Sequence, residues 1–382
     1  IYISPRTSIS IGIESFKGTC LIVLTLFVIS SPIIPSPRVA AVFKIPFSSI
    51  ILSITIFPLL VSKSESFKTV IFLTKISPKS NFIFIDSLIS LMTYFENLLS
   101  FYEKELDETL DFWYNYGYDK VNGGFYVCLE RNGDVYDTDK SVWAQGRGLW
   151  IFSKAYNDIK KDPRYLKAAT DAYNFIKKNC YDTDGRMWFT VTGDGIGIQK
   201  RRYWFSESFA VVGSAELYKA TGNKEYLETA RSTFDTMLKV KIGEIKTEPK
   251  FNPDVVNCIA LASPMILLVT CQILRDIDVE KKDYYNSIIN DSIEEIKLHY
   301  HPEYKAVFEN VNLDGSIVAG SRGRLVNPGH SIEASWFLMN ESVYRNNDKE
   351  LMNMALNILE WSFNLGWDYD VGGLRYFVDV AG

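Results

Sequence analysis

The amino-acid sequence predicts an all-α fold, an (α/α)6 barrel of helical hairpins with short β excursions in the turns. Two observations predict it. From Met92 to Gly382, apolar residues recur at helical spacing in one segment after another. The segments that join these helices repeat with a period of about 62 residues, which is enough for two helices and one turn.

The repeat is clearest in the first and last turns. Residues 115–126 and 364–376 both read Asn-x-Gly-aromatic-Asp, followed by a Gly-Gly pair. Weaker copies begin at Asn179 and His299, so a degenerate copy is expected near position 239. Neither the first nor the last copy of the repeat resembles the polar cap that ends an open solenoid. The hairpins are therefore expected to close into a ring.

Helices are expected in chain order after residue 92. The first opens with an amphipathic run at 94–99, and the last but one begins after Asn327, a good N-cap, with Pro328 at its first position. The expected ranges are 93–116, 141–160, 162–179, 203–221, 223–240, 254–274, 279–299, 329–345 and 348–366. A ring of six hairpins needs three more helices, so the last hairpins are expected to be missing from residues 92–382, an incomplete barrel domain.

Residues 1–91 differ from the rest of the chain. They hold three acids, eight bases and no tryptophan, and they follow neither a helical nor a strand period. Prolines interrupt or follow the apolar runs at 21–29 and 45–61, whereas a membrane-spanning helix needs about 20 apolar residues. Because the first methionine is Met92, we expect residues 1–91 to be a non-native or disordered extension; a membrane anchor is the alternative.

The charge and the cysteines limit the function classes. Residues 92–382 carry 43 of the 46 acids and 33 of the 41 bases, a balance that argues against nucleic acid as a partner. The five cysteines form no CxxC pair and do not cluster with histidine, which indicates reduced thiols, a cytoplasmic location and no metal site. The sequence contains no GxGxxG before a helix, no P-loop, no HExxH and no GxSxG.

Helix 141–160 places a charge on its apolar stripe. Trp143, Arg147 and Trp150 lie on one face, and glycines flank the arginine. A guanidinium there needs a partner or a wet cavity. The functional interpretation is that Arg147 reaches a substrate oxygen; the structural alternative is a buried ion pair between helices.

Two further side chains are candidate ligand groups. Glu207 lies among aromatic residues at the start of helix 203–221, where it binds a ligand or pairs with Arg202 or Arg147. Trp367 lies in the last turn, where it stacks on a sugar ring or packs in the core. The other two histidines besides His330, at 299 and 301, flank a turn, and we expect them to be solvated.

His330 is the strongest catalytic candidate. It lies in the first turn of its helix, and Glu333 follows on the same face. The positive end of a helix disfavours imidazolium, so we expect a neutral imidazole that can act as a general base. Glu333 would orient His330 or bind a hydroxyl; a core histidine hydrogen-bonded by Glu333 is the structural alternative.

These motifs together resemble the N-acylglucosamine 2-epimerase family, which includes the renin-binding proteins. The resemblance is collinear from Met92 to Gly382 and rests on Tyr136-Asp137 and on residues 142–147, 203–209, 327–338, 366–368 and 372–374. Cellobiose 2-epimerases and related aldose–ketose isomerases share the His-x-x-Glu-Ala segment. The Asn-Pro-Gly approach to His330 is more similar to the acylglucosamine branch.

The resemblance implies interconversion of N-acetylglucosamine and N-acetylmannosamine by proton abstraction and return at C2 through an enolate. It implies His330 as one proton-transfer group, Arg147 as the group that stabilises oxygen charge and Glu333 as a positioning residue. It implies substrate-binding roles for Trp143, Gln145, Glu207 and Trp367. It implies an amino-sugar substrate, no cofactor, no membrane or nucleic-acid partner, and compatibility with a homodimer.

One departure from the family concerns catalysis. The second histidine of these enzymes lies in a late helix, and this sequence has no match for it, so we expect the chain of 382 residues to have little or no epimerase activity. Animal members respond to nucleotides such as ATP, but no phosphate loop supports that effector here. An inverting glycosidase on the same barrel is a further alternative, with Glu207 and Glu333 as its carboxylate pair.

Overall fold

The computed structural model describes residues 7–16, 19–29, 57–59, 66–70, 78–248, 252 and 255–381. The chain divides into two compact units, Ile1–Glu108 and Thr109–Gly382, and each is described by itself. Within the described part of the chain, no helix combines the length and the apolar character needed to cross a lipid bilayer.

The first unit contains a four-stranded sheet and most of one long helix. Antiparallel strands β1 (Thr7–Phe16), β2 (Thr19–Ile29), β4 (Ser66–Val70) and β3 (Phe57–Leu59) are neighbours in that order. Helix α1 (Pro78–Phe112) begins 15 residues before the expected start at 93 and so crosses Met92. The non-native origin of residues 1–91 remains a prediction. Residues of this range that belong to neither β1–β4 nor α1 lie outside the described residues.

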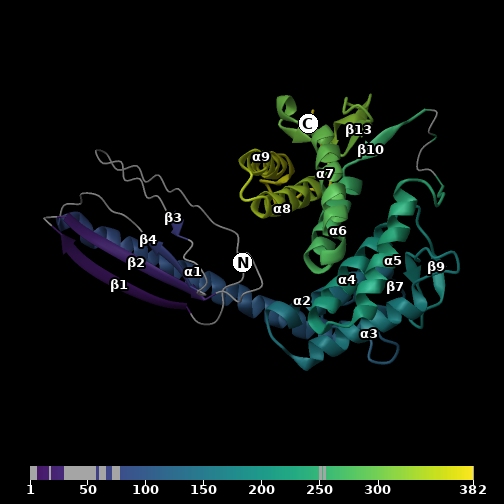
Figure 1. Ribbon diagram of the computed structural model, residues 1–382, viewed down its shortest axis with the longest axis horizontal. Coiled ribbons are helices and arrows are strands. Elements are labelled where there is room, and N and C mark those ends of the chain that lie inside the picture. Colours follow the sequence, from purple (N-terminus) through teal and green to yellow (C-terminus); the bar gives the residue numbers. More distant parts are fainter. Residues whose placement is uncertain are drawn as a thin grey trace. The chain divides into compact units, whose positions relative to one another are not determined.

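The second unit is helical with short strands (Figure 1). A π-helical turn at Trp113–Gly117 ends α1. The helices that follow are α2 (Val142–Asp158), α3 (Pro163–Asn179), α4 (Phe205–Thr221), α5 (Lys224–Lys241), α6 (Ala262–Ile277), α7 (Lys282–His299), α8 (Pro328–Tyr344) and α9 (Lys349–Gly366). Single 3₁₀ turns lie at Val279–Lys281, Pro302–Tyr304 and Ser321–Arg324. All the expected helices are present among the described residues.

Eleven short strands lie before α2, α4, α6 and α8 and after α9, within the described residues. They are β5 (Cys128–Leu129), β6 (Val135–Asp137), β7 (Lys140–Ser141), β8 (Thr190–Val191), β9 (Gly197–Gln199), β10 (Cys258–Ala260), β11 (Tyr300–His301), β12 (Ala306–Val307), β13 (Asn310–Asn312), β14 (Leu325–Val326) and β15 (Val378–Asp379). They pair as β5–β6, β7–β8–β9, β10–β13, β11–β12 and β14–β15.

One helix begins later than expected. The range 254–274 was expected to be helical, but α6 starts at Ala262. Residues 258–260 instead pair with Asn310–Asn312, about fifty residues further along the chain. This tertiary pairing outweighs the local apolar pattern, which cannot by itself separate a short strand from a helix.

Sequential hairpins form an inner and an outer row. Each even-numbered helix packs on the next odd-numbered one, as α8 and α9 do side by side in Figure 1. The even-numbered helices also pack on one another in sequence, α2 on α4, α4 on α6 and α6 on α8. Short strands precede each of the inner helices α2, α4, α6 and α8, so they gather at one end of this row, and β15, which follows α9, pairs with β14 at the same end.

The turn repeat is confirmed in the backbone. The Asp119 N–H donates to the Gly124 carbonyl at 2.9 Å, and the Asp368 N–H donates to the Gly373 carbonyl at the same distance. Gly124 and Gly373 both have positive φ, 73° and 97°, which a residue with a side chain rarely adopts. The two turns therefore have the same geometry for the same stereochemical reason.

Gly146 sets the distance between α2 and α4. A Cβ at this position would lie 2.6 Å from the backbone carbonyl carbon of Phe209, and one at Gly213 would lie 2.8 Å from the Gly146 carbonyl oxygen. Two inner helices therefore approach through glycine on both sides. Glycine costs about 1 kcal/mol in a helix interior, a cost that this close packing offsets.

Gly146→Ala is therefore expected to lower the free energy of unfolding by about 1–3 kcal/mol, since the added methyl group meets backbone. Urea unfolding followed by circular dichroism measures it. Gly329→Ala, in the first turn of α8, is the matched control, because its Cβ meets only Asn327 Oδ1 at 3.3 Å. A stability equal to that of the control would contradict the close approach.

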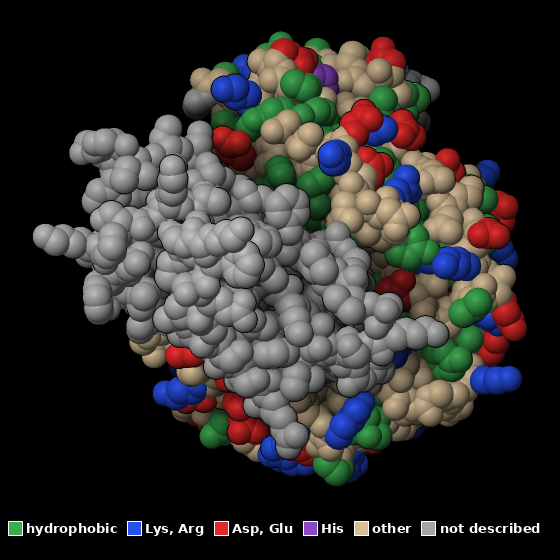
Figure 2. Space-filling model, turned by 60° about the vertical axis from the view of Figure 1, so that its left-hand side comes forward, with side chains coloured by type: hydrophobic (Ala, Val, Ile, Leu, Met, Phe, Trp, Pro, Cys, Tyr) green, Lys and Arg blue, Asp and Glu red, His purple; other side chains and the backbone are tan. Residues whose placement is uncertain are grey.

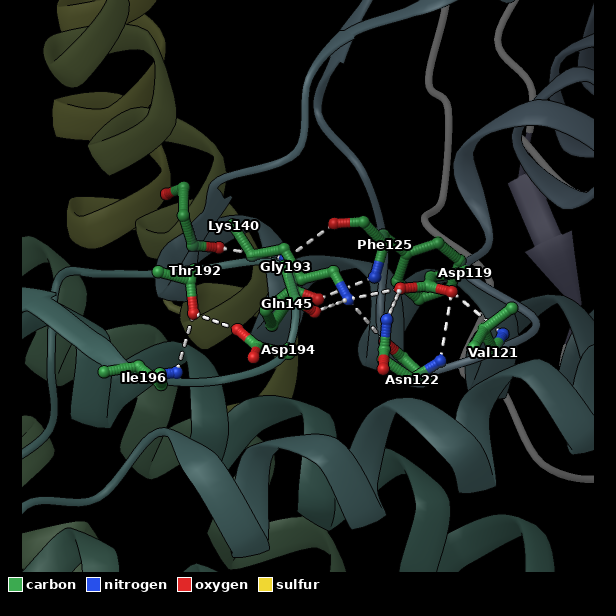
Figure 3. Close-up of polar contacts among 12 residues, drawn as sticks. Asp119, Val121, Asn122, Phe125, Lys140, Gln145, Thr192, Gly193, Asp194 and Ile196 are labelled. Atoms are coloured by element: carbon green, nitrogen blue, oxygen red, sulfur yellow. Dashed lines mark hydrogen bonds and ion pairs between the residues drawn. The ribbon is translucent and has the colours of Figure 1, made fainter.

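A buried lysine joins the first two β excursions. Lys140 is fully buried, and its Nζ donates to Asp119 Oδ2 at 2.7 Å, to the Gly123 carbonyl at 2.9 Å and to the Gly193 carbonyl at 2.8 Å (Figure 3). Burial raises the pKa of Asp119, but the bonds from Lys140 and from two backbone N–H groups outweigh it and hold the pKa at about 2. The ion pair fixes the excursions that precede α2 and α4.

Candidate active site

His330 lies where the sequence predicts it, in the first turn of α8. The Asn327 side chain caps the helix, with its Oδ1 accepting from the His330 N–H at 3.1 Å, and Pro328 is the first helical residue. The imidazole is 31% exposed, so it is accessible from solvent while most of its surface is covered.

The partner of His330 is Glu309, which the sequence analysis missed. The Glu309 carboxylate lies with Oε2 at 3.0 Å and Oε1 at 3.2 Å from His330 Nδ1. Glu309 lies between β12 and β13, 21 residues before the histidine. The only local signal for it was a carboxylate in the otherwise apolar run Ala306-Val307-Phe308-Glu309.

This contact corrects the expected charge of His330. Burial lowers the pKa of the imidazole, but the hydrogen bond that its Nδ1–H donates to Glu309 and the charges of Glu309 and Glu333 outweigh it, so the pKa is raised above 6.5. The expectation that the helix N-terminus favours the neutral imidazole is therefore wrong in direction, because the pKa is raised and not lowered. Two carboxylates dominate over the partial charge of the helix end.

Arg147 and Glu333 share the electrostatic environment of His330. The Arg147 guanidinium from α2 stacks on the Phe209 ring with its central carbon 3.9 Å from the centroid. Burial lowers the pKa of Arg147, while the charge of Glu333 on α8 opposes that change. Glu333 is exposed and acts on His330 through its charge, whereas Glu309 makes the hydrogen bond. The charge of Glu333 therefore acts both on Arg147 of α2 and on His330 of α8.

Trp143 forms an aromatic wall beside Arg147. Its ring contacts Phe205 and Phe209, with centroids 5.7 and 5.8 Å away, and its Nε1 donates to Ser206 Oγ at 3.1 Å. Because Arg147 stacks on the same Phe209, a cation and an apolar surface are adjacent between α2 and α4. This combination suits a ring that carries both hydroxyl and apolar groups.

Gln145 and Glu207 are buried and bonded to the fold instead. Gln145 accepts from the Phe125 N–H at 2.7 Å and donates to the Phe125 carbonyl at 2.9 Å. Glu207 Oε1 accepts from Arg186 Nε at 2.7 Å and from the Met187 N–H at 3.0 Å. The expected partners of Glu207, Arg202 or Arg147, were wrong, because Arg186 holds that carboxylate in an ion pair.

Trp367 belongs to the last turn. Its ring stacks on Phe363 with centroids 5.1 Å apart, and its backbone bridges to Leu374. The neighbouring Gly366 packs against Pro328, where an added Cβ would lie 2.4 Å from the proline Cβ. The turn therefore lies against the start of α8, while the indole stacks on the last turn of α9.

The other two histidines are not solvated, contrary to expectation. His299 is fully buried, and its Nδ1 donates to the Phe308 carbonyl at 2.8 Å. His301 is mostly covered, with Nδ1 at 2.9 Å from Glu303 Oε1 and Nε2 at 3.2 Å from the Gly315 carbonyl. Both imidazoles are hydrogen-bonded to groups in the segment that follows α7.

On the face shown in Figure 2, basic and acidic side chains are interspersed over the described surface. Among the side chains that the structure describes, no group of three or more His, Cys, Asp or Glu could hold a metal ion.

Comparisons with known proteins show which family and which relatives this chain resembles. The profile of the family described as N-acylglucosamine 2-epimerase (GlcNAc 2-epimerase) matches residues 124–382. The N-acylglucosamine 2-epimerase of Mus musculus is 32% identical over 289 residues, covering 73% of this chain and 68% of the mouse protein. The cellobiose 2-epimerase of Dictyoglomus turgidum is 25% identical over 272 residues, covering 65% of this chain and 68% of that protein.

Solved structures of low identity share the fold. A D-mannose isomerase superposes with a TM-score of 0.63 at 18% identity, covering 74% of this chain and 75% of that one. The cellobiose 2-epimerase of Bacillus thermoamylovorans superposes with a TM-score of 0.62 at 23% identity, covering 74% and 76%. The predicted (α/α)6-barrel fold class is thereby confirmed.

Proposed function

Because the chain belongs to the N-acylglucosamine 2-epimerase family, we propose that it acts on the C2 proton of N-acetylglucosamine and N-acetylmannosamine. The observation that carries this proposal is the group formed by His330, its partner Glu309, and the nearby charges of Glu333 and Arg147. The 32% identity to the mouse enzyme supports an N-acetylated amino sugar as the substrate.

The proposed chemistry starts from the open-chain sugar, whose C2 proton is acidified by the C1 aldehyde. The free imidazole nitrogen of His330 takes this proton, and the electrons of the C–H bond move to the C1 oxygen. The Arg147 guanidinium stabilises the negative charge that develops there, which is the usual role of a preorganised cation. Return of a proton to the opposite face of C2 completes epimerisation.

Inversion needs a proton-transfer group on each face of C2. The chain contains three histidines, and His299 and His301 are both used by the turn after α7. His330 is therefore the one imidazole proposed for the site. Exchange of the C2 proton with solvent is expected to exceed conversion of one sugar into the other.

The test is incubation with N-acetylmannosamine in deuterated water, followed by NMR. Deuterium is expected at C2 of the recovered sugar, and His330→Gln is expected to reduce its incorporation roughly 10²–10⁴-fold, the range for loss of a general base. Because the base must be unprotonated, incorporation should rise with pH through the raised pKa of His330. His301→Gln is the control. Unchanged incorporation in His330→Gln would overturn the proposal.

The second candidate is a cellobiose 2-epimerase, favoured by the similarity to the Dictyoglomus turgidum enzyme. Supplying cellobiose in the same deuterium experiment separates the two substrates. An inverting glycosidase is disfavoured, because Glu207 is fully buried in its ion pair with Arg186 and cannot activate water. A cytoplasmic location belongs to the proposal too, supported by the free thiols of Cys128, Cys180, Cys258 and Cys271.

A further inference from the structure

We propose that Glu309 is the positioning residue of the site: it holds His330 in the Nδ1-protonated tautomer and thereby makes Nε2 the atom that exchanges a proton with the sugar. The assignment of the sugar rests on the proposed function, whereas the tautomer and the basicity of the imidazole do not. Nothing in the local sequence around His330 points to Glu309.

The geometry determines which ring nitrogen carries the proton. Both oxygens of the Glu309 carboxylate lie within 3.2 Å of Nδ1. An ionised carboxylate only accepts hydrogen bonds, so Nδ1 has to be the donor. In a neutral imidazole the other nitrogen, Nε2, then carries the lone pair.

Glu309 is held on both sides by the backbone. Its N–H donates to the Leu325 carbonyl at 2.8 Å, and its carbonyl accepts from the Leu261 N–H at 3.0 Å. One bond leads to β14, just before α8, and the other to the residue before α6. The Glu309 carboxylate therefore belongs to a segment that is hydrogen-bonded to the residues just before the N-termini of α6 and α8.

A second histidine supports the same segment. The buried His299 side chain donates to the Phe308 carbonyl at 2.8 Å, and the Phe308 N–H donates to the His299 carbonyl at 3.0 Å. The residue before Glu309 is thus bonded twice to the end of α7. With its side chain only 12% exposed, Glu309 has little freedom to turn away from the imidazole.

Two carboxylates act on this imidazole, and one of them also interacts with a guanidinium. Glu309 faces it through a hydrogen bond and a charge, and Glu333 faces it from α8 through its charge. Arg147 from α2 interacts with Glu333. Loss of the Glu309 charge removes both contributions of that residue, so the proton affinity of His330 should fall below its value in the wild-type chain.

NMR titration of the three histidines tests this inference without any sugar. In protein labelled with ¹⁵N-histidine, long-range proton–nitrogen spectra report the tautomer and pKa of each ring, and His299→Gln and His301→Gln assign the signals. Glu309→Gln is expected to lower the pKa of His330 by about one pH unit or more, a tenfold loss of proton affinity. Glu309→Leu is expected also to abolish the preference for Nδ1–H.

Two controls separate positioning from general disruption. Glu333→Gln removes a charge without touching Nδ1, so it is expected to lower the pKa less and to leave the tautomer unchanged. Glu309→Asp keeps the charge and is expected to retain most of the raised pKa. An unchanged tautomer in Glu309→Leu, or an unchanged pKa in Glu309→Gln, would overturn the role of Glu309.

The outcome is distinguishable from failure of the proposed function. If the titrations follow expectation but no deuterium enters C2 of N-acetylmannosamine, the assigned sugar chemistry is wrong and the tautomer assignment stands. If deuterium enters C2 and Glu309→Gln leaves both the titration and its pH profile unchanged, the sugar chemistry stands and the inference about Glu309 fails.

Discussion

Lys140→Met is expected to lower the free energy of unfolding by about 3–5 kcal/mol, the range for removing one partner of a buried ion pair. The lysine is fully buried, and so is Asp119. The substitution leaves the Asp119 carboxylate uncompensated in the interior. It also leaves the carbonyls of Gly123 and Gly193 without the donor that they share (Figure 3).

Urea unfolding at pH 7 measures this loss, with Lys297→Met as the matched control. Lys297 pairs with Glu294 on the surface of α7, with side chains 45% and 70% exposed. An ion pair of that kind contributes about 0–1 kcal/mol, so the control should stay close to the wild-type chain. Equal effects of the two substitutions would mean that Lys140 does not compensate a buried charge.

The helices could be predicted because their determinants are local. The apolar stripe of α2 and the Asn327-Pro328 start of α8 lie within a few residues of the backbone that they shape. The repeat of the first and last turns was likewise visible as a Gly-Gly pair at a fixed offset. Where a determinant was distant, as for the pairing of β10 with β13, the local pattern predicted the wrong element.

The candidate site could be predicted only in part, for the same reason. His330 and Arg147 could be proposed from the sequence because each occupies a distinctive position on its own helix: the histidine lies in the first turn of α8, and the arginine lies on the apolar stripe of α2. Glu309 could not be proposed, because tertiary backbone bonds, including those to Leu261 and Leu325, place it beside the imidazole. The partner of a buried carboxylate is equally invisible in a sequence, so Glu207 could not be assigned to Arg186.

Acidification from about pH 6.5 to pH 4 is expected to lower the free energy of unfolding by about 3 kcal/mol through His299 alone. Burial lowers the pKa of this imidazole from 6.5 to about 4, although the hydrogen bond to the Phe308 carbonyl opposes that change. Between these values the unfolded chain binds a proton that the folded chain does not. Stability is therefore greatest above pH 6.5 and falls as the pH drops.

His299→Gln isolates this effect, because glutamine can still donate to the Phe308 carbonyl but does not titrate. Denaturant unfolding of both proteins at several pH values gives two curves, which should converge or cross as the pH falls toward 4. His301, His330 and the carboxylates are common to both proteins, so their contributions cancel in the difference. A constant difference between the curves would show that His299 takes up its proton equally well in the folded chain. In that case the His299 ring would not be the rigid, uncharged support beneath Phe308 and Glu309 that the geometry of the site requires.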